Sequence, residues 1–407
     1  MTDLDQDLQQ RLKTLRAEGL MRVLRRIDSA QGPIVTVQGR ELINLSSNDY
    51  LGLSQDERLK EAARVALDQF GVGSGASRLI CGSLAPHHQL EETLADWKGA
   101  EAALVFSSGY AAAWGTLTAL LEKGDIVILD KLAHACLVDA ARQSGARLRV
   151  YAHNDLNDLE RKLQWADAQR QGGEGRRPRA IVVTESVFSM DGDLAPLRDL
   201  VELKHRYGAW LFVDEAHATG LFGAGRRGLA EAFEVSDQVE IQMGTLGKAL
   251  GVSGGYICGS RRLIDFLIHR ARSFMFSTAP APCVSAAARA AVEVVRGAEG
   301  EERRTRLWLL LDGLKSGLIE SGQRLAAVRS PIIPWLLGEE SRAVACSDAL
   351  RDAGLLIPAI RYPTVARGTA RLRITMTAAH QRTHLQSFLA ALTSLRTGNS
   401  VLNPEHA

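Results

Sequence analysis

The chain has 407 residues, of which 46% are hydrophobic and 24% are charged, as in an ordinary globular protein with a substantial core. Its 49 basic and 47 acidic residues give a formal net charge of +2, which gives no reason to expect a nucleic acid or an anionic membrane as partner. The five cysteines lie far apart and never in C-x-x-C spacing, so we expect a cytoplasmic protein with neither a disulfide framework nor a metal site.

The N-terminal segment is predicted to form a helical arm. Apolar residues recur at helical spacing from Leu8 to Ile27, with charged residues between them. We expect this arm to pack on the body of the protein or on a second subunit. A strand-rich stretch, IVTVQGRELINL, follows with a QG turn. The acidic start lacks an apolar signal region, and no run of 18 apolar residues follows anywhere, so we expect no membrane span.

From about Asn48 to Pro282 short apolar strands alternate with helical stretches. Near-continuous apolar runs are typical of strands that are covered on both faces, and the alternation indicates an α/β domain with a mostly parallel sheet. In such sheets the ligand site lies at the carboxyl ends of the strands. The expected strands are ALVFSS, DIVILD, RLRVYA, AIVVTES, WLFVDEA, EIQMGTL and GGYICGS.

The pattern of expected helices and strands changes again near residue 285. An Ala-rich helix, SAAARAAVEVVRG, leads to charged helices, to strands IIPWLL, LIPAIRYP and ARLRITM, and to a final helix from His384 to Leu395. We therefore predict an arm over 1–47, a large domain over 48–284 and a smaller α+β domain over 285–407. The segment QRQGGEGRRPR is expected to be a surface loop within the large domain.

Asp214 ends one expected strand in the tetrapeptide DEAH, and this pattern has two possible meanings. A nucleotide-driven helicase would need an upstream phosphate-binding loop, G-x-x-x-x-G-K-[ST]. The only Gly-Lys pair, at Lys248, lies downstream and is followed by Ala249, so the helicase interpretation fails on both pattern and order.

The second meaning is an acid that faces pyridoxal phosphate. Asp214, His217, Thr245 and Lys248 all follow strand ends on the expected rim of the sheet. A lysine forms a Schiff base with the cofactor aldehyde, and an acid beside the ring nitrogen keeps that ring an electron sink. His217 is placed to hydrogen-bond the phenolic oxygen, although it could instead cap the next turn.

Two further strand ends fit this cofactor. Ser107-Ser108-Gly109-Tyr110 opens a helix directly after a strand, where backbone N–H groups can bind a phosphate. His134 follows the next strand, where its imidazole could stack on the ring.

Taken together, these motifs resemble the α-oxoamine synthases, a family of fold-type I pyridoxal-phosphate enzymes. The resemblance covers the chain from about Arg25 to about His384 and implies a seven-stranded, mostly parallel sheet with helices on both faces. The matching stretches, which are specific in their joint order and spacing, are SSNDYLGL, FGVGSGASRLICGS, SSGYAAAWG, HACL, TESVFSMDGDLAPL, VDEAHATG, GTLGKALG, FSTAPAP and RYPTVARGTARLRITMTAAH.

The resemblance implies a role for each matching residue of the cofactor site. Lys248 would hold the cofactor and later remove the substrate α-proton, Asp214 would pair with the ring nitrogen, and His134 would stack on the ring and also face the substrate. Ser189 and His217 would flank the phenolic oxygen. The expected catalytic set is therefore Lys248, Asp214, His134 and His217.

The resemblance also implies which residues would bind the cofactor phosphate and the substrates. Gly109, Tyr110 and Thr245 would hold the phosphate, with Ser277 or Thr278 of the partner subunit in a homodimer.

Asn48 and Arg373 would bind the amino-acid carboxylate, for which a planar guanidinium is suited. Arg25, Arg361 and Thr364 would line the acyl end, with the arginine adjacent to Arg25 as an alternative.

Members of this family join an amino acid to an acyl thioester with loss of CO2. The stretches AIRYPTVARGTARLRIT and SMDGDLAPL favour the branch that joins L-alanine to pimeloyl-CoA or a pimeloyl carrier protein in biotin synthesis. Glycine C-acetyltransferase, another branch, would share every cofactor residue. A cofactor-binding protein without catalysis is disfavoured, because it would not need both Lys248 and Asp214.

Overall fold

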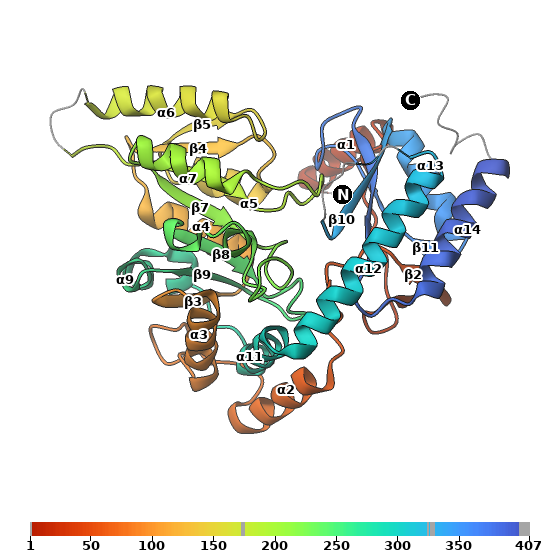
Figure 1. Ribbon diagram of the computed structural model, residues 1–407, viewed down its shortest axis with the longest axis horizontal. Coiled ribbons are helices and arrows are strands. Elements are labelled where there is room, and N and C mark those ends of the chain that lie inside the picture. The colour runs from red at the N-terminus through yellow and green to blue at the C-terminus, as the bar shows by residue number, and fades with distance from the viewer. Residues whose placement is uncertain (1, 172–175, 324, 326–329, 399–407) are drawn as a thin grey trace.

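The computed structural model describes residues 2–171, 176–323, 325 and 330–398, and these form two lobes (Figure 1). The larger lobe is built on a seven-stranded sheet, and the smaller lobe contains the C-terminal helices and two short sheets. Helix α12, Ala298–Glu320, runs along the smaller lobe towards the larger one.

The large sheet has the order β3-β9-β8-β7-β6-β4-β5, and β9 runs in the direction opposite to the other six strands. Every residue of β3, β4 and β6 is buried, as expected for strands covered on both faces. The strands are β3 Ala102–Phe106, β4 Ile126–Asp130, β5 Arg147–Tyr151, β6 Ala180–Glu185, β7 Trp210–Asp214, β8 Ile241–Thr245 and β9 Gly255–Gly259.

Helices cover both faces of this sheet, which confirms the predicted fold class. One face packs on α4 Gly109–Leu120, α5 Ala135–Gln143, α9 Arg261–Arg270 and α10 Arg272–Met275. The other face packs on α6 Leu156–Gln171, α7 Leu197–Arg206 and α8 Leu229–Ala232. A short 3-10 turn, η1 Ser236–Gln238, precedes β8.

Three helices at the lower end of the view join the two lobes. Helices α2 Glu57–Phe70 and α3 Ala85–Lys98 both pack against α11 Pro282–Arg296. Their apolar residues belong to one continuous core that also includes side chains of α12 and of the smaller lobe. The lobes therefore share a core.

The smaller lobe holds an antiparallel sheet of order β10-β13-β12. Its strands are β10 Ile332–Gly338, β12 Ala359–Ile360 and β13 Ala370–Thr375, and α13 Glu340–Asp352 and α14 Arg382–Gly398 complete the lobe. The predicted strand LIPAIRYP is two strands in different sheets, because β11 Leu355–Leu356 pairs with β2 and not with β13.

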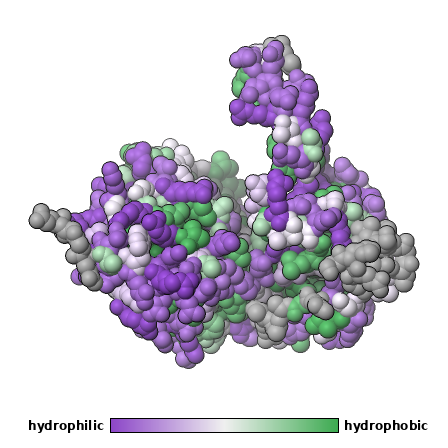
Figure 2. Space-filling view, turned by 90° about the horizontal axis from the view of Figure 1, so that it is seen from above, coloured by the Kyte–Doolittle hydropathy of each residue, from purple (hydrophilic) through white to green (hydrophobic). Residues whose placement is uncertain are grey.

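The N-terminal segment differs from the prediction at its helix. Helix α1 covers Asp3–Ala17 and ends before Gly19, which has a positive φ of 67° that glycine adopts readily, so the helix does not continue to Ile27. No residue of α1 is buried, and Figure 2 shows this arm standing clear of the body.

The predicted QG turn is present. Gln38 and Gly39 both have positive φ and join β1 Ile34–Val37 to β2 Arg40–Asn44, as in a two-residue hairpin. Since β2 also pairs with β11, the N-terminal hairpin is part of a sheet with the C-terminal segment. The limits 1–47, 48–284 and 285–407 stay a prediction, and the loop QRQGGEGRRPR lies partly outside the described residues.

Candidate active site

Two acids end neighbouring strands on the same face of the large sheet. Glu185 at the end of β6 pairs in register with Asp214 at the end of β7. Since side chains alternate between faces, both carboxyl groups point to the face that carries α4 and α5. Both residues are buried, with exposed fractions of 2% and 5%. The carboxyl end of the sheet therefore presents two acids to the first turns of these two helices.

Lys248 follows the next strand, in a tight turn closed by the hydrogen bond from Gly251 N to Lys248 O, 2.8 Å. Burial raises the pKa of Asp214, and the positive charge of Lys248 opposes that rise. Burial likewise lowers the pKa of Lys248, and the negative charge of Asp214 is the largest effect that opposes this shift, followed by the smaller effect of Glu185 when it is ionised. The three groups thus lie within electrostatic reach of one another, as an amine that reacts with an aldehyde requires.

The first turn of α4 lies beside this cluster. Ser108 caps the helix, since its hydroxyl accepts a hydrogen bond from Ala111 N at 3.1 Å. A Cβ atom on Gly109 would come within 3.2 Å of the Met243 side chain and 3.8 Å of that of Thr245, so the helix start approaches β8 closely. The N–H groups at this helix start form a site suited to a phosphate.

Thr245 and Tyr110 have partners of their own at this helix start. The Thr245 hydroxyl donates to Gly254 O at 2.9 Å and accepts from Gly247 N at 3.2 Å. The half-exposed Tyr110 donates its hydroxyl proton to Asp139 at 3.0 Å. Binding of a phosphate by the Thr245 hydroxyl would therefore require it to leave Gly254 O.

His134 caps α5 at the adjacent strand end. Its Nδ1 accepts a hydrogen bond from Cys136 N at 3.2 Å and lies 3.0 Å from Cys136 Sγ. An accepting Nδ1 places the ring proton on Nε2 when the imidazole is neutral. This capping bond fixes the plane of the His134 ring.

Tyr50 joins the two halves of the site. Its hydroxyl oxygen lies 2.7 Å from His217 Nδ1 and accepts from Arg373 Nη2 at 3.2 Å. Arg373 also donates to Asn48 Oδ1 at 3.1 Å and to Ser189 O at 2.6 Å. Five residues from distant parts of the sequence are thereby joined in one network, and all of them except Asn48 are buried.

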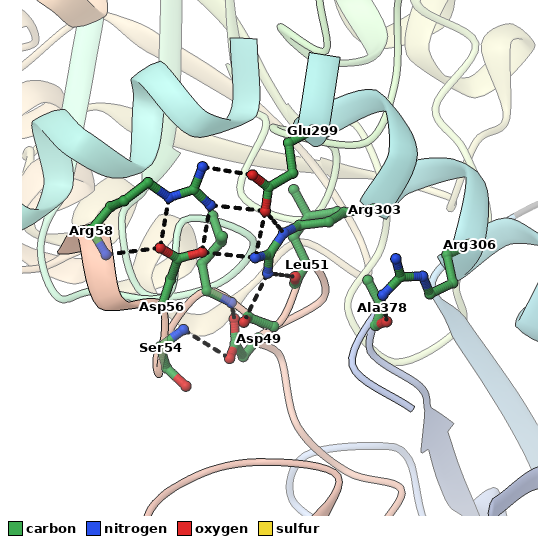
Figure 3. Close-up of polar contacts among 11 residues, drawn as sticks. Asp49, Leu51, Ser54, Asp56, Arg58, Glu299, Arg303, Arg306 and Ala378 are labelled. Atoms are coloured by element: carbon green, nitrogen blue, oxygen red, sulfur yellow. Dashed lines mark hydrogen bonds and ion pairs between the residues drawn. The ribbon is translucent and has the colours of Figure 1, made fainter. Parts of the chain in front are cut away.

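The loop that carries Asn48 and Tyr50 is held by α12 (Figure 3). Arg303 donates to Leu51 O at 3.0 Å and to Gly52 O at 3.1 Å. Its other terminal nitrogen lies 2.7 Å from carboxylate oxygens of both Asp56 and Glu299. A buried backbone segment of the site is thus tied to a helix of the smaller lobe.

The loop that carries Ser189 is braced by His153. The two ring nitrogens of His153 lie 2.9 Å from Asp130 and 2.6 Å from Asp193, and the ring meets Phe188 edge-on at 4.4 Å. Hydrogen bonds to the two carboxylates raise the pKa of His153 to about 10, against the effect of burial. His153 is therefore protonated at neutral pH and links two strand ends to this loop.

The residues predicted for the acyl end are less closely grouped. Arg361 donates to the carbonyl oxygens of Gly19 and Met21, at 2.6 and 2.7 Å, and Thr364 is exposed in the same turn. Arg25 is exposed on the segment after α1, and no contact joins it to Arg361 in the described part of the chain. The structure thus brings Arg361 and Thr364 together and leaves Arg25 apart.

Sequence reasoning singled out neither Tyr50 nor Glu185. Glu185 carried the same signal as Asp214, a polar residue at the end of a continuous apolar strand. Tyr50 lies within the quoted stretch SSNDYLGL, but the partners of its hydroxyl group depend on contacts across the whole chain. Within the described residues, no group of three His, Cys, Asp or Glu residues is arranged to hold a metal, and no helix is long and apolar enough to span a membrane.

A family model described as aminotransferase class I and II matches residues 40–392. The chain is 50% identical over 384 residues, or 94% of each chain, to a protein named 8-amino-7-oxononanoate synthase from Anaeromyxobacter dehalogenans (strain 2CP-1).

Solved structures agree with this similarity. A variant serine palmitoyltransferase from S. paucimobilis, with a bound PLP–myriocin aldimine, has a TM-score of 0.88 at 30% identity and covers 98% of this chain and 100% of that one. An 8-amino-7-oxononanoate synthase from Francisella tularensis has a TM-score of 0.74 at 26% identity, with 88% and 98% covered.

Proposed function

The chain belongs to the class I and II aminotransferase family, and from this membership we propose that it is a pyridoxal-phosphate-dependent acyltransferase. It joins L-alanine to a pimeloyl thioester and releases 8-amino-7-oxononanoate, CO2 and the free thiol, a reaction of biotin biosynthesis. The observation that carries the proposal is the 50% identity to an 8-amino-7-oxononanoate synthase over 94% of both chains.

The residues present fit pyridoxal 5'-phosphate. Lys248 has no ion pair among the described residues, as expected for an amine that reacts with an aldehyde, and Asp214 is a buried acid at the next strand end. The start of α4 offers backbone N–H groups of Gly109 and Tyr110 to the phosphate, with the Thr245 hydroxyl beside them.

When bound, the cofactor supplies an electron sink for the charge left at the alanine α-carbon. Asp214 holds the proton on the ring nitrogen, and its effect is strong because the site is buried. His217 would donate from Nε2 to the phenolic oxygen of the cofactor, Ser189 would flank that oxygen, and His134 would stack on the ring. Lys248 Nζ takes the α-proton of alanine.

Asn48 and Arg373 bind the carboxylate of alanine in this proposal. A guanidinium group has five N–H groups, and Arg373 uses three of them on Ser189, Asn48 and Tyr50. One N–H group on each terminal nitrogen remains for the two oxygens of a carboxylate. This two-pronged geometry is specific to arginine.

For the acyl end, we assign the distal carboxylate of the pimeloyl group to Arg361, with Thr364 beside it and Arg25 on the exposed segment after α1. The carrier is CoA or a carrier protein, and both present the same thioester. Arg361 already donates to two carbonyl oxygens of residues 19–21, so these residues border the proposed acyl site.

A second branch has a specific observation in its favour. The backbone resembles serine palmitoyltransferase more closely, by TM-score, than it resembles the 8-amino-7-oxononanoate synthase from Francisella tularensis. Backbone similarity at about 30% identity reports the shared fold, whereas substrate choice depends on side chains. The 50% identity to 8-amino-7-oxononanoate synthase therefore outweighs it.

We further propose a cytoplasmic homodimer. Val72, Ile80 and Phe276 are 81%, 79% and 69% exposed. They lie near the bridge between Ser77 and Thr278 that brings two segments of the chain together at the surface. A second copy that covers these apolar side chains would bring Ser277 or Thr278 of the partner subunit towards the phosphate. The five free cysteines suit a reducing compartment.

The proposal is tested with purified protein supplied with pyridoxal 5'-phosphate. Three substrate pairs are compared by mass spectrometry of the products: alanine with pimeloyl-CoA, glycine with acetyl-CoA, and serine with palmitoyl-CoA. We expect 8-amino-7-oxononanoate as the main product and, after borohydride reduction, one cofactor-labelled peptide that contains Lys248. A preference for either other pair would move the protein to another branch.

A further inference from the structure

Glu185 is a buried acid to which the proposed function gives no role. It is 2% exposed, and its Oε1 has no hydrogen-bond partner among the described residues. Most buried polar atoms in folded proteins have a partner, and one that lacks it costs stability. Glu215, the residue after Asp214, illustrates the usual case, because its two carboxylate oxygens accept hydrogen bonds from Leu229 N and Ala230 N at 2.9 and 2.8 Å.

The position of Glu185 is that of a site residue. It pairs in register with Asp214, on the sheet face that carries α4 and α5. Strand β6 lies between β7 and β4, the strand that His134 follows, and Ser189 comes shortly after Glu185 in the chain. The backbone N–H groups of His134 and Ser189 lower the pKa of Glu185. Glu185 therefore lies between the segments that carry two proposed cofactor contacts.

Asp214 and Glu185 cannot share this position as two anions without a large cost, because like charges in neighbouring buried positions disfavour ionisation of one of them. Asp214 is the better stabilised anion, since its Oδ1 accepts from Ala216 N at 2.9 Å. Burial, and then the charge of Asp214, raise the pKa of Glu185 to about 8, while Lys248 opposes this rise. Glu185 is thus the partner that keeps its proton at neutral pH.

We propose that Glu185 is an uncharged positioning residue of the cofactor site, which completes its hydrogen bonding in the loaded protein and holds the segments of His134 and Ser189 on either side of the bound ring. This inference rests on the proposed function, because it requires pyridoxal phosphate at this site. A carboxylic acid has one donor and an acceptor, so it can bridge a backbone N–H group and a ligand acceptor.

The variants Glu185→Gln and Glu185→Ala test whether Glu185 acts as an uncharged acid or as a carboxylate, because glutamine imitates only the uncharged form. Glutamine keeps the shape and the neutral polarity, so we expect its affinity for pyridoxal 5'-phosphate at pH 7 to stay within about threefold of wild type. Alanine removes the hydrogen bonds, and we expect the affinity to fall about tenfold. The readouts are the visible absorbance of the cofactor and its dissociation constant for the cofactor-free protein.

The pH profile adds a readout that a purely structural role would not change. Ionisation of Glu185 beside Asp214, Lys248, His134 and Cys136 should weaken cofactor binding in wild type as the pH rises above about 8. Glu185→Gln should lack this transition. The matched control is Glu215→Gln, which should lower the melting temperature of the cofactor-free protein but leave the pH profile unchanged.

Equal loss of affinity in both variants would mean that the ionised carboxylate acts, and would overturn the inference. Wild-type affinity in Glu185→Ala would overturn it as well, with the proposed function intact. Failure of the wild-type protein to take up pyridoxal 5'-phosphate would instead overturn the proposed function, and this inference with it.

Discussion

The hydroxyl oxygen of Tyr50 and Nδ1 of His217 lie 2.7 Å apart in a buried pair. Burial raises the pKa of Tyr50 more than the charge of Arg373 lowers it, so the phenol keeps its proton. Burial also lowers the pKa of His217 well below its usual value, so the imidazole is neutral. The phenol has two acceptors in reach, His217 Nδ1 at 2.7 Å and Asn48 Oδ1 at 3.3 Å. Asn48 Oδ1 already accepts from Arg373, so we assign the phenol proton to the shorter contact with Nδ1, which puts the proton of the neutral His217 on Nε2.

This pair predicts the effect of Tyr50→Phe. The variant leaves Nδ1 of His217 and one N–H group of Arg373 without a partner, at a cost of about 1–3 kcal/mol of stability. We expect kcat to fall about 10–100-fold, with a shifted cofactor absorbance, because the tautomer of His217 is no longer fixed. Spectra and kinetics measure both effects. Wild-type absorbance in Tyr50→Phe would contradict this tautomer assignment.

Asp214→Asn tests the charge at the ring nitrogen. The shape is retained, but the neutral amide cannot hold a proton on that nitrogen. We expect the cofactor to bind, while exchange of the alanine α-proton slows by about 10³-fold or more, as for loss of a preorganised charge. Exchange is measured by NMR with deuterated alanine, without any thioester. Near-normal exchange would remove Asp214 from its proposed role.

Arg373→Lys tests the two-pronged carboxylate site. Lysine keeps the charge but cannot contact Ser189, Asn48, Tyr50 and a carboxylate together. We expect the KM for alanine to rise about 30-fold or more, while the KM of the thioester changes little. An equal rise in both constants would indicate a general loss of structure and not a carboxylate site.

The sequence predicts the large sheet well and the connections between distant segments poorly. Apolar runs such as those of β4 and β6 are local patterns, and their burial on both faces follows from the helices between them. The pairing of β2 with β11 joins residues about 310 positions apart, which no local pattern encodes. For the same reason LIPAIRYP reads as one strand although its halves pair with different sheets.

The same distinction applies to the site. The predicted residues Asp214 and Lys248 lie together because strand ends of the parallel sheet meet on one rim. Asn48 and Arg373 come from outside that sheet and join His217 through Tyr50. From the sequence alone, Tyr50 would be predicted to be an ordinary aromatic residue of the core, although its phenol joins several of these residues. Its function as a hydrogen-bond junction becomes visible only when His217 and Arg373, more than 160 positions away, are placed beside it.

His153 predicts a dependence of stability on pH. Its pKa is raised in the folded protein from 6.5 to about 10, by hydrogen bonds to Asp130 and Asp193. The stabilisation is therefore fully present below about pH 6.5 and is lost as the pH rises through about 10. We expect His153→Gln to lower the free energy of unfolding at pH 7 by about 2–4 kcal/mol, and by much less above pH 10.

Denaturant unfolding at several pH values checks the His153 prediction. His205→Gln is the control, since His205 is exposed and, among the described residues, its side chain forms a hydrogen bond only with that of Gln238, at 3.3 Å. It should leave stability unchanged at every pH. A loss in His153→Gln that stays constant up to pH 10.5 would mean that packing against Phe188, and not charge, accounts for the effect.

The last prediction concerns Arg361 and the acyl substrate. A pimeloyl group ends in a carboxylate and an acetyl group does not, so only a pimeloyl enzyme needs a cation at this end of the site. We expect Arg361→Ala to lower kcat/KM for pimeloyl-CoA about 30–1,000-fold, since an uncompensated charge is costly to bury. The control is Arg367→Ala in the same loop, an exposed arginine over the ring of Tyr362, which should change little.

Arg361 also holds residues 19–21 through two carbonyl oxygens, so a loss of activity alone would not identify its role. The methyl ester of pimeloyl-CoA separates the two possibilities, because it keeps the whole pimeloyl chain, adds only one methyl group and carries no charge at that end. If Arg361 binds the carboxylate, wild type prefers the acid strongly and Arg361→Ala treats acid and ester alike. If Arg361 only anchors the N-terminal segment, the variant loses activity on both thioesters by the same factor, and the preference for the acid is retained.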